Sequence, residues 1–480
     1  MTIGQILAAL GWFCMLYVAA INLGYLALNV VSFVVLGRYM RRHPAEDYQP
    51  ASDFEPPVSL IVPAYNEAAT VVASVRSLQQ LRYPQFEIIV VNDGSKDDTL
   101  RALQQAFGLE PFPEVLRVRL DTARVRGVYR SPSYPGLRVI DKENGGKADA
   151  LNAGINAALY PLFCGLDADG VLQPDSLSRI VRPFLEDPRT VATGGIIRVA
   201  NGCEVMGGWL VRAGLSRNPL ALFQVVEYCR GFLFGRLGWN PLNAVLVISG
   251  AFGVFHKETV IAAGGYRRGI VGEDMELVVR LHRVLRDAGT PYRITFVPDP
   301  VCWTEVPESM SVLARQRIRW QTGLCESLRM NLGLMFGRRR GYAGWVAFPF
   351  ALLFEVLSPI VETFGYLLFV VAFLGGYLDF GFAIAFLTAT IGFGILLSAS
   401  SLLLDEVSFH TYPKTRHMFL LLAAAVAENV GYRQLNSLWR LWGTIRWMIG
   451  AKPAWGTMTR TAAWSRDLTS KRTIPMAERS

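Results

Sequence analysis

Two carboxylates separated by one residue follow an apolar stretch in the middle of the chain. Asp167 and Asp169 come directly after residues 162–166, whose sequence Leu-Phe-Cys-Gly-Leu predicts a buried strand. Residues two apart in an extended strand point to the same side, so both carboxylates can reach one place. Such hard oxygen ligands suit Mg²⁺ or Mn²⁺ held jointly with a diphosphate. A polar turn is the plainer alternative, since Asp-x-Asp is a common sequence.

Two glycine-containing turns offer hydrogen-bonding groups near predicted element ends. Asp93 lies in the sequence Asn-Asp-Gly-Ser at 92–95, where its carboxylate can accept hydrogen bonds from a nucleobase or a ribose. Lys147 ends the sequence Asn-Gly-Gly-Lys at 144–147 and opens a predicted helix. Backbone N–H groups and the lysine charge favour an anion there. A turn that only starts a helix explains either sequence without a ligand.

Two adjacent carboxylates precede the predicted helix 275–286. Acidic residues are favoured at a helix N-terminus by the helix dipole, so capping explains Glu273 and Asp274 without a chemical role. The alternative is a general base, which the transfer of a group to a hydroxyl requires. Asp274 is the first candidate for that base, and Glu273 is the second.

A basic and aromatic sequence, Gln-Arg-Ile-Arg-Trp, occupies residues 316–320. On a helix, Gln316, Arg319 and Trp320 share one face. A guanidinium suits a diphosphate through bidentate hydrogen bonds, and an indole ring suits stacking on a sugar. A basic interfacial helix with a tryptophan anchor is the alternative, because apolar sequence follows closely.

Alternating strands and helices should position these residues. Strands are predicted at 58–62, 86–91, 137–140 and 162–166, and helices at 67–81, 147–158 and 175–185. This alternation predicts an α/β fold with a mostly parallel sheet covered on both sides. Ligands of such sheets bind beyond the C-terminal ends of the strands, where the aspartates fall.

Apolar segments surround this charged middle. Residues 2–37 carry no charge and residues 380–404 carry none, and each can hold a membrane-spanning helix. Basic residues after position 37 place the N-terminus outside and the next segment in the cytosol. The stretch 341–378 contains Glu355 and Glu362, so it is either an interfacial helix before a span or one kinked span. The two glutamates lie either on a polar path or at the interface. Three or four crossings are expected.

These patterns divide the chain into four regions: an N-terminal membrane helix at 1–40, an α/β domain at 41–340, membrane or interfacial helices at 341–432, and a basic, tryptophan-rich membrane-surface tail at 433–480. Of all residues, 51% are hydrophobic and 18% are charged, which excludes a disordered chain. The net charge of +9 fits a lipid bilayer better than nucleic acid, and no nucleic-acid partner is expected. The six scattered cysteines indicate reduced thiols.

Taken in order, the motifs resemble those of the family 2 inverting glycosyltransferases. The similarity includes Ala64-Tyr-Asn-Glu67, the residues 92–95, 167–169, 272–274 and 316–320, and Lys147. More narrowly, the chain looks like the membrane-embedded processive synthases of cellulose, hyaluronan and poly-N-acetylglucosamine, over about residues 10–405. It departs from them at Gly272, where their motif begins with threonine. The arginine-rich stretch 110–138 has no assigned role.

The resemblance implies a cytosolic catalytic domain of the GT-A type, which is Rossmann-like, in the inner (plasma) membrane of a bacterium. It also implies a role for each motif residue. By this resemblance, Asp93 would contact the uracil, Tyr65 and Glu67 would line the nucleoside pocket, and Lys147 would lie near the nucleotide. Asp167 and Asp169 would contact the sugar nucleotide, with Asp169 the firmer ligand of Mg²⁺ or Mn²⁺, and Asp274 would be the base with Glu273 beside it. The processivity motif would consist of Gln316, Arg319 and Trp320, with Arg317 available to the diphosphate.

The implied activity is the polymerisation of a β-linked glycan from UDP-N-acetylglucosamine or UDP-glucose, coupled to export. Its partners would be the donor, the growing glycan or a lipid acceptor, the bilayer, and export or regulatory proteins. One alternative is a transferase that adds a single sugar to a membrane lipid. An alternative of another class is a transporter or receptor with a nucleotide-binding module.

Overall fold

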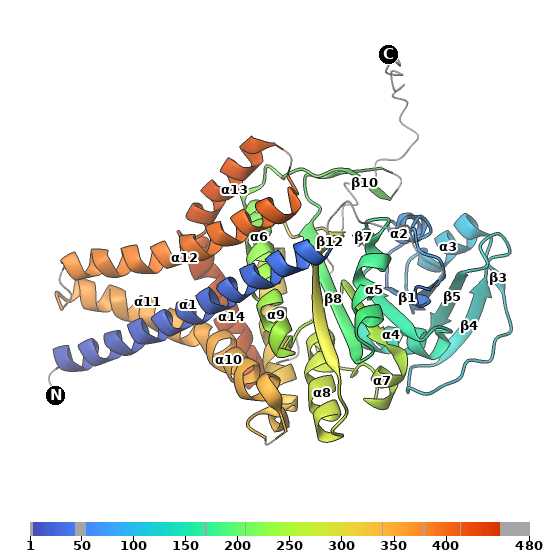
Figure 1. Ribbon diagram of the computed structural model, residues 1–480, viewed down its shortest axis with the longest axis horizontal. Helices are drawn as coiled ribbons and strands as arrows, with labels where there is room; N and C mark the ends of the chain where they lie inside the picture. Colours follow the sequence, from blue (N-terminus) through green and yellow to red (C-terminus); the bar gives the residue numbers. More distant parts are fainter. Residues whose placement is uncertain are drawn as a thin grey trace, which may run out of the picture.

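A mixed ten-stranded sheet lies at one end of the molecule and a group of long apolar helices at the other (Figure 1). The computed structural model describes residues 3–43, 54–168, 170–206, 208–337, 339–377, 380–412 and 414–451. The strand order is β3-β4-β5-β2-β1-β6-β11-β8-β12-β7, and a separate two-stranded sheet pairs β9 (Glu204–Met206) with β10 (Trp209–Arg212).

The predicted parallel sheet forms one half of this structure. Strands β1 (Val58–Ala64), β2 (Phe86–Asp93), β5 (Leu137–Lys142) and β6 (Leu162–Leu166) are neighbours in parallel register. Each strand is rich in Val, Ile and Leu and almost entirely buried, as is typical of a parallel sheet covered on both faces. The four predicted strands and the α/β fold class are confirmed.

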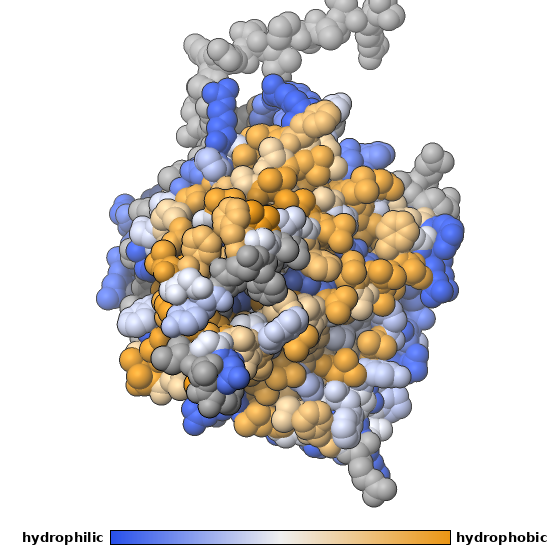
Figure 2. All heavy atoms as spheres, turned by 90° about the vertical axis from the view of Figure 1, so that its left-hand side faces the viewer, coloured by the Kyte–Doolittle hydropathy of each residue, from blue (hydrophilic) through white to orange (hydrophobic). Residues whose placement is uncertain are grey.

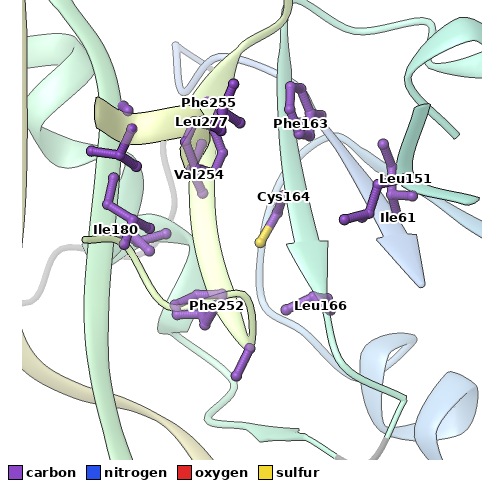
Figure 3. Packing of buried hydrophobic residues seen from close by; sticks show 14 of the residues in the cluster. Ile61, Leu151, Phe163, Cys164, Leu166, Ile180, Phe252, Val254, Phe255 and Leu277 are labelled. Atoms are coloured by element: carbon purple, nitrogen blue, oxygen red, sulfur yellow. The ribbon is translucent and has the colours of Figure 1, made fainter. Parts of the chain in front are cut away.

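The other half of the sheet contains an antiparallel strand. β11 (Phe252–His256) lies antiparallel between β6 and β8 (Thr190–Val199), and β12 (Arg293–Thr304) is parallel to β8. Figure 3 shows how Phe163 and Cys164 of β6 pack beside Phe252 and Val254 of β11. The remaining strands lie at the edges: β7 (Val171–Leu172), β3 (Glu110–Pro111) and β4 (Val125–Arg130).

The arginine-rich stretch 110–138 builds one edge of the sheet. Arg138 is 3% exposed and donates to Glu87 and Glu114, with nitrogen–oxygen distances of 2.6 and 2.7 Å. Arg130 also pairs with Glu114, at 3.0 Å. These arginines therefore tie the edge strands to the interior of the sheet.

Helices connect the strands and pack on them. The predicted helix 67–81 is shorter in the structure, because Asn66 has a φ of 56° and the helix begins only at Val71. The helices of this half are α2 (Val71–Leu78), α3 (Thr99–Phe107), α4 (Lys147–Ala157), α5 (Ser176–Glu186), α6 (Pro219–Cys229), the π-helical turn η2 (Arg230–Phe234), η3 (Leu237–Leu242), α7 (Lys257–Ala262), α8 (Glu273–Asp287), α9 (Met310–Met330) and η4 (Leu332–Leu334).

Within the described part of the chain, three helical stretches are long and apolar enough to cross a membrane: Gly4–Arg42, Ala343–Leu374 and Thr390–Phe409. They belong to α1 (Ile3–Arg42), to the run of η5 (Ala343–Ala347), α10 (Phe348–Ala351), η6 (Leu352–Val356) and α11 (Ser358–Leu374), and to α12 (Phe380–Phe409). Figure 2 shows that hydrophobic residues dominate the end of the molecule that these helices form. α1 packs against both α11 and α12.

Two shorter helices follow. α13 (Thr415–Ala427) has 13 residues, fewer than the roughly 20 that a membrane-crossing helix needs. α14 (Tyr432–Met448) packs along α9, so this part of the chain expected to be a membrane-surface tail is an ordered helix against the α/β domain. Residues 452–480 lie outside the described residues.

Candidate functional site

Asp93 is held by a ring of donors at the end of β2. Its Oδ1 accepts from the Gly145 N–H at 3.0 Å and from the Lys142 ammonium at 2.5 Å, and its Oδ2 accepts from the Gly146 N–H at 2.8 Å. The carboxylate is 3% exposed. Glycine suits both positions, because a β-carbon on Gly145 would clash with the Asp149 side chain and Gly146 adopts a φ of 88°. Asp93 therefore fixes the turn that leads into Lys147.

The loop after β1 interlocks with the loop after β2. The Asn66 N–H donates to Ser95 Oγ at 3.0 Å, and the Glu67 N–H donates to Thr99 Oγ1 at 2.9 Å. Glu67 also accepts a hydrogen bond from Thr70 at 2.6 Å. The ring of Tyr65 is 44% exposed beside these contacts. The residues expected to line a nucleoside pocket thus lie on one shared rim at the C-terminal ends of neighbouring strands.

Lys147 joins the first turn of α4 to two acidic residues. Its Nζ lies 2.5 Å from Asp167 Oδ1 and 3.8 Å from Glu273 Oε1. Burial alone would lower the pKa of Lys147, but the carboxylates of Asp167 and Glu273 outweigh it and raise the pKa above its usual range. The ammonium is therefore a permanent positive charge between β6 and α8.

Asp274 and Glu273 lie in the first turn of α8. Asp274 Oδ2 accepts from the Gly250 N–H at 2.9 Å, and Oδ1 accepts from the Met275 N–H at 2.8 Å. Lys147 Nζ also reaches Gly250 O, at 3.4 Å. The N-cap of α8 is Gly272, and Asp274 binds a backbone N–H of the first turn while lying near the Lys147 cluster. A structural role in that turn is therefore compatible with a role as the base. Burial raises the pKa of Glu273 to about 7, although Lys147 acts in the opposite direction.

The helix α9, which carries the Gln-Arg-Ile-Arg-Trp sequence, touches α8 through two glycines. A β-carbon added to Gly272 would lie 2.8 Å from the carbonyl oxygen of Gly323, and one added to Gly323 would lie 2.9 Å from Gly272. This backbone contact accounts for a glycine where the resembling synthases begin their motif with threonine. It holds the two helices that carry Asp274 and Trp320 directly against each other.

The side chains of that sequence divide between two environments. Trp320 is 45% exposed, and the Arg317 guanidinium lies 4.3 Å from its ring centroid. Arg317 is 2% exposed and pairs with Glu227 of α6 at 2.7 Å, so it contacts that residue and not the Lys147 cluster. Gln316 Oε1 is buried without a hydrogen-bond partner among the described residues. Arg319 is partly buried.

α14 completes the surroundings of α9. Arg440 donates from Nε to Gln321 Oε1 at 2.9 Å and from Nη2 to the Glu355 carbonyl at 2.6 Å. Gln321 in turn donates to Thr444 at 3.2 Å. One hydrogen-bond network thus joins α9, α14 and the apolar stretch 343–374.

A cavity of about 1020 Å³ extends from this region between the apolar helices. Its wall includes Met275, which follows Asp274, and both Glu355 and Glu362. Both glutamates thus line this cavity, and the choice between a polar path and the membrane interface stays a prediction. Sequence reasoning missed other polar wall residues, whose positions depend on tertiary packing. These are Glu227, Arg230, Arg236, Arg433 and Arg440.

A divalent cation fits the donor set only in part. Asp167 offers a carboxylate whose side chain is 31% exposed, and its Oδ1 contacts Lys147. Asp169 lies outside the described residues. The described residues contain no group of three His, Cys, Asp or Glu side chains that could hold a metal ion. An ion at Asp167 would therefore need further oxygen ligands, such as those of a diphosphate.

Comparison with known proteins gives consistent matches. The model of Glycosyl transferase family 2 matches residues 59–208, and that of Glycosyl transferase family group 2 matches residues 163–397. The poly-beta-1,6-N-acetyl-D-glucosamine synthase of Staphylococcus aureus (strain COL) is 28% identical over 314 residues, which are 65% of this chain and 64% of that protein. The synthase of the same name from Staphylococcus epidermidis is 29% identical over 267 residues, 55% of this chain and 54% of that protein.

The matched region spans less than two thirds of the length of these curated relatives. Among solved structures, the chain is similar to the mannosyltransferase PcManGT from Pyrobaculum calidifontis in complex with GDP-Man and Mn²⁺. The TM-score is 0.48 at 17% sequence identity, and the similarity covers 91% of this chain and 99% of that one.

Proposed function

The chain belongs to glycosyltransferase family 2, and we propose that it extends a β-linked polysaccharide from a UDP-sugar. The observation that carries this proposal is the continuous set of contacts from Asp93 through the glycine turn and Lys147 to Asp167 and Gly250, which binds Asp274. The printed name of the Staphylococcus relatives supports UDP-N-acetylglucosamine as the donor, with UDP-glucose as the second choice.

In this proposal, Asp274 is the general base. It accepts the proton of the acceptor hydroxyl while that oxygen attacks the anomeric carbon from the face opposite the nucleotide. One displacement inverts the donor linkage and releases UDP. Lys147 stabilises the negative charge of the leaving diphosphate from within a part-buried site, where electrostatic interactions are stronger than in water. The remaining assignments, Tyr65, Glu67 and Asp93 at the nucleoside and Gln316, Arg319 and Trp320 at the acceptor, complete the site.

Asp167 and Asp169 would hold Mg²⁺ or Mn²⁺ together with the diphosphate. The ion would supply electrostatic stabilisation of the leaving group. The partial donor set at Asp167 is compatible with this assignment, because an ion shared with the substrate needs few protein ligands.

The proposed product leaves through the cavity between the apolar helices. The cavity begins beside Asp274 at Met275 and reaches residues of α1 and α11. Its wall combines charged side chains with aromatic rings, including Trp12, Tyr25 and Trp239. Such a surface offers hydrogen bonds and stacking to a sugar chain. We place the catalytic half on the cytosolic side of the inner membrane, because basic residues Arg41 and Arg42 end α1 next to it.

A single transfer to a lipid remains the second candidate. The part of the cavity between α1 and α11 is lined by apolar residues such as Leu7, Met15 and Val370, which suit a hydrocarbon chain. Product size separates the two candidates. A transporter or receptor function does not agree with membership in an enzyme family.

The test uses the purified full-length protein in detergent with UDP-N-acetylglucosamine and UDP-glucose. We expect UDP release from one of the two donors with Mg²⁺ or Mn²⁺, loss of release with EDTA, and a product of many sugars. A product of one sugar on an extracted lipid would favour the second candidate. No UDP release from either donor would contradict both.

A further inference from the structure

Arg236 has an unusual environment in the wall of the cavity. It follows the π-helical turn η2, and π-helical turns are often found at functional sites. Its guanidinium carbon lies 3.9 Å from the ring centroid of Phe232. Its Nη1 nitrogen is buried and has no hydrogen-bond partner among the described residues. Buried donors are nearly always paired, because an unpaired one has given up its hydrogen bonds to water without replacement.

Other buried arginines of the described chain are paired with carboxylates. Arg230 contacts Glu428 at 2.7 Å, and Arg317 contacts Glu227 at 2.7 Å. Arg198 makes two contacts with Asp405, the shorter at 2.6 Å. Arg236 also rests on an aromatic ring, as Arg317 does, and the ring fixes the plane of its guanidinium. Unlike Arg317, it has no carboxylate partner among the described residues, and its Nη1 donor has no acceptor there.

Arg236 lies near the proposed base, Asp274, and near Glu355 of the apolar stretch 343–374. Asp274 and Glu355 are among the charged groups that act on it electrostatically. Burial lowers the pKa of Arg236 to about 10, and Asp274 opposes that change, so the side chain stays protonated at neutral pH. Arg236, Met275 and Glu355 line the same cavity.

Gly231 lines the same cavity. A β-carbon added to this second residue of η2 would meet no atom within 4 Å. The indole ring of Trp239 belongs to the same wall. Met275, the residue after Asp274, lines the cavity together with Arg236, so Arg236 lies on the cavity side from which the proposed acceptor enters.

We propose that Arg236 binds the acceptor: its N–H groups donate to oxygen atoms of the terminal sugar of the growing chain and hold the attacking hydroxyl beside Asp274. This proposal rests on the proposed function. A guanidinium has donors and no acceptor, so the group that it recognises is a ring or hydroxyl oxygen, or the carbonyl of an N-acetyl group. Trp239 and Phe232 supply the flat surfaces that fix the sugar and the arginine.

The experiment compares Arg236→Gln and Arg236→Lys with the wild type, each as the full-length protein in detergent with UDP-N-acetylglucosamine. Two quantities are measured at each donor concentration: UDP released and sugar incorporated into polymer. For Arg236→Gln we expect a donor KM within about twofold of the wild type. Sugar incorporated per UDP should fall roughly tenfold or more, because donor hydrolysis continues while the acceptor is poorly held. The polymer should also be shorter, and Arg236→Lys should lie between the two.

Arg130→Gln is the matched control. Arg130 also lies over a phenylalanine ring, with its guanidinium 4.1 Å from the centroid of Phe112, but at the sheet edge away from the cavity. It should incorporate sugar as the wild type does.

Three results would overturn the proposal for Arg236. The first is unchanged sugar incorporation per UDP in a folded Arg236→Gln variant. The second is a raised donor KM, which would indicate a contact with the diphosphate. The third applies if Arg236→Gln does not fold, and it is wild-type sugar incorporation per UDP in Arg236→Lys. Absence of UDP release by the wild type would instead contradict the proposed function.

Discussion

Lys147 Nζ lies 2.5 Å from Asp167 Oδ1, and this ion pair joins the start of α4 to the end of β6. The glycine turn before Lys147 is bound to Asp93 at the end of β2. Two strand ends and a helix N-terminus are therefore connected through one lysine. A change at this residue should affect donor binding more than folding, because the side chains of the pair are 21% and 31% exposed.

Replacement of Lys147 by methionine should raise the donor KM by roughly 10- to 100-fold, the range for losing a charge-assisted hydrogen bond. Lys147→Arg should retain part of the affinity. Initial rates of UDP release against donor concentration measure the effect. A donor KM equal to that of the wild type would exclude Lys147 from the nucleotide site.

Asp274→Asn should reduce turnover by at least about 10²-fold, because an amide cannot accept the proton of the hydroxyl. The donor KM should change little, since Asp274 contacts the Gly250 and Met275 amides and not the Lys147 side chain. The comparison variant is Glu273→Gln. If Glu273→Gln shows the roughly 10²-fold loss of turnover and Asp274→Asn does not, the base is Glu273.

Stability should fall as the pH rises toward neutrality because of Glu273. Burial raises the pKa of this carboxyl to about 7 from an ordinary 4.5, so the folded protein keeps a proton that the unfolded chain has released between these values. Unfolding is then favoured by increasing pH within that window. The apparent unfolding temperature of Glu273→Gln, measured in detergent between pH 5 and 8, should decline less than that of the wild type. Parallel curves for both proteins would contradict this assignment.

Gly323→Ala should destabilise the contact between α8 and α9. The added methyl would lie 2.9 Å from the backbone of Gly272, and overpacking of this kind costs about 1–3 kcal/mol. The unfolding temperature should fall, and turnover should fall with it because Trp320 moves relative to Asp274. Gly392→Ala in α12 is the control, since a β-carbon there meets no atom within 4 Å. Equal unfolding temperatures for the two variants would refute the predicted strain.

Local sequence patterns predicted the parallel strands well. The strand at 162–166 has the same bounds in the structure, and the helix predicted at 147–158 is α4, Lys147–Ala157. These elements are continuous apolar runs or amphipathic segments bounded by Gly, Asp or Pro, so the signal is contained in the segment itself. Asp93 ends β2 and Asp167 follows β6 at the same edge of the sheet, while the gathering of all the aspartates around one ligand stays a prediction.

Long-range packing supplied what the sequence could not predict. β11 inserts antiparallel between β6 and β8, a pairing across distant residues that leaves no mark in Phe252–His256 itself. Arg236 looks like any basic residue near an apolar segment until its ring contact and cavity are known. Arg317 was expected to serve the diphosphate because arginine suits phosphate, but its partner in the structure is Glu227, 90 residues earlier. The roles of the motif residues stay predictions.

The hydrogen bonds among Gln321, Arg440 and the Glu355 carbonyl bear on how the protein can be dissected. Gln321 and Thr322 are each 2% exposed because α14 covers them. A fragment cut at residue 340 would lose that cover and present the polar and apolar groups of α9 to water. The catalytic half is therefore not a unit that can be excised as a soluble enzyme; it needs the C-terminal helices to keep its own last helix in place.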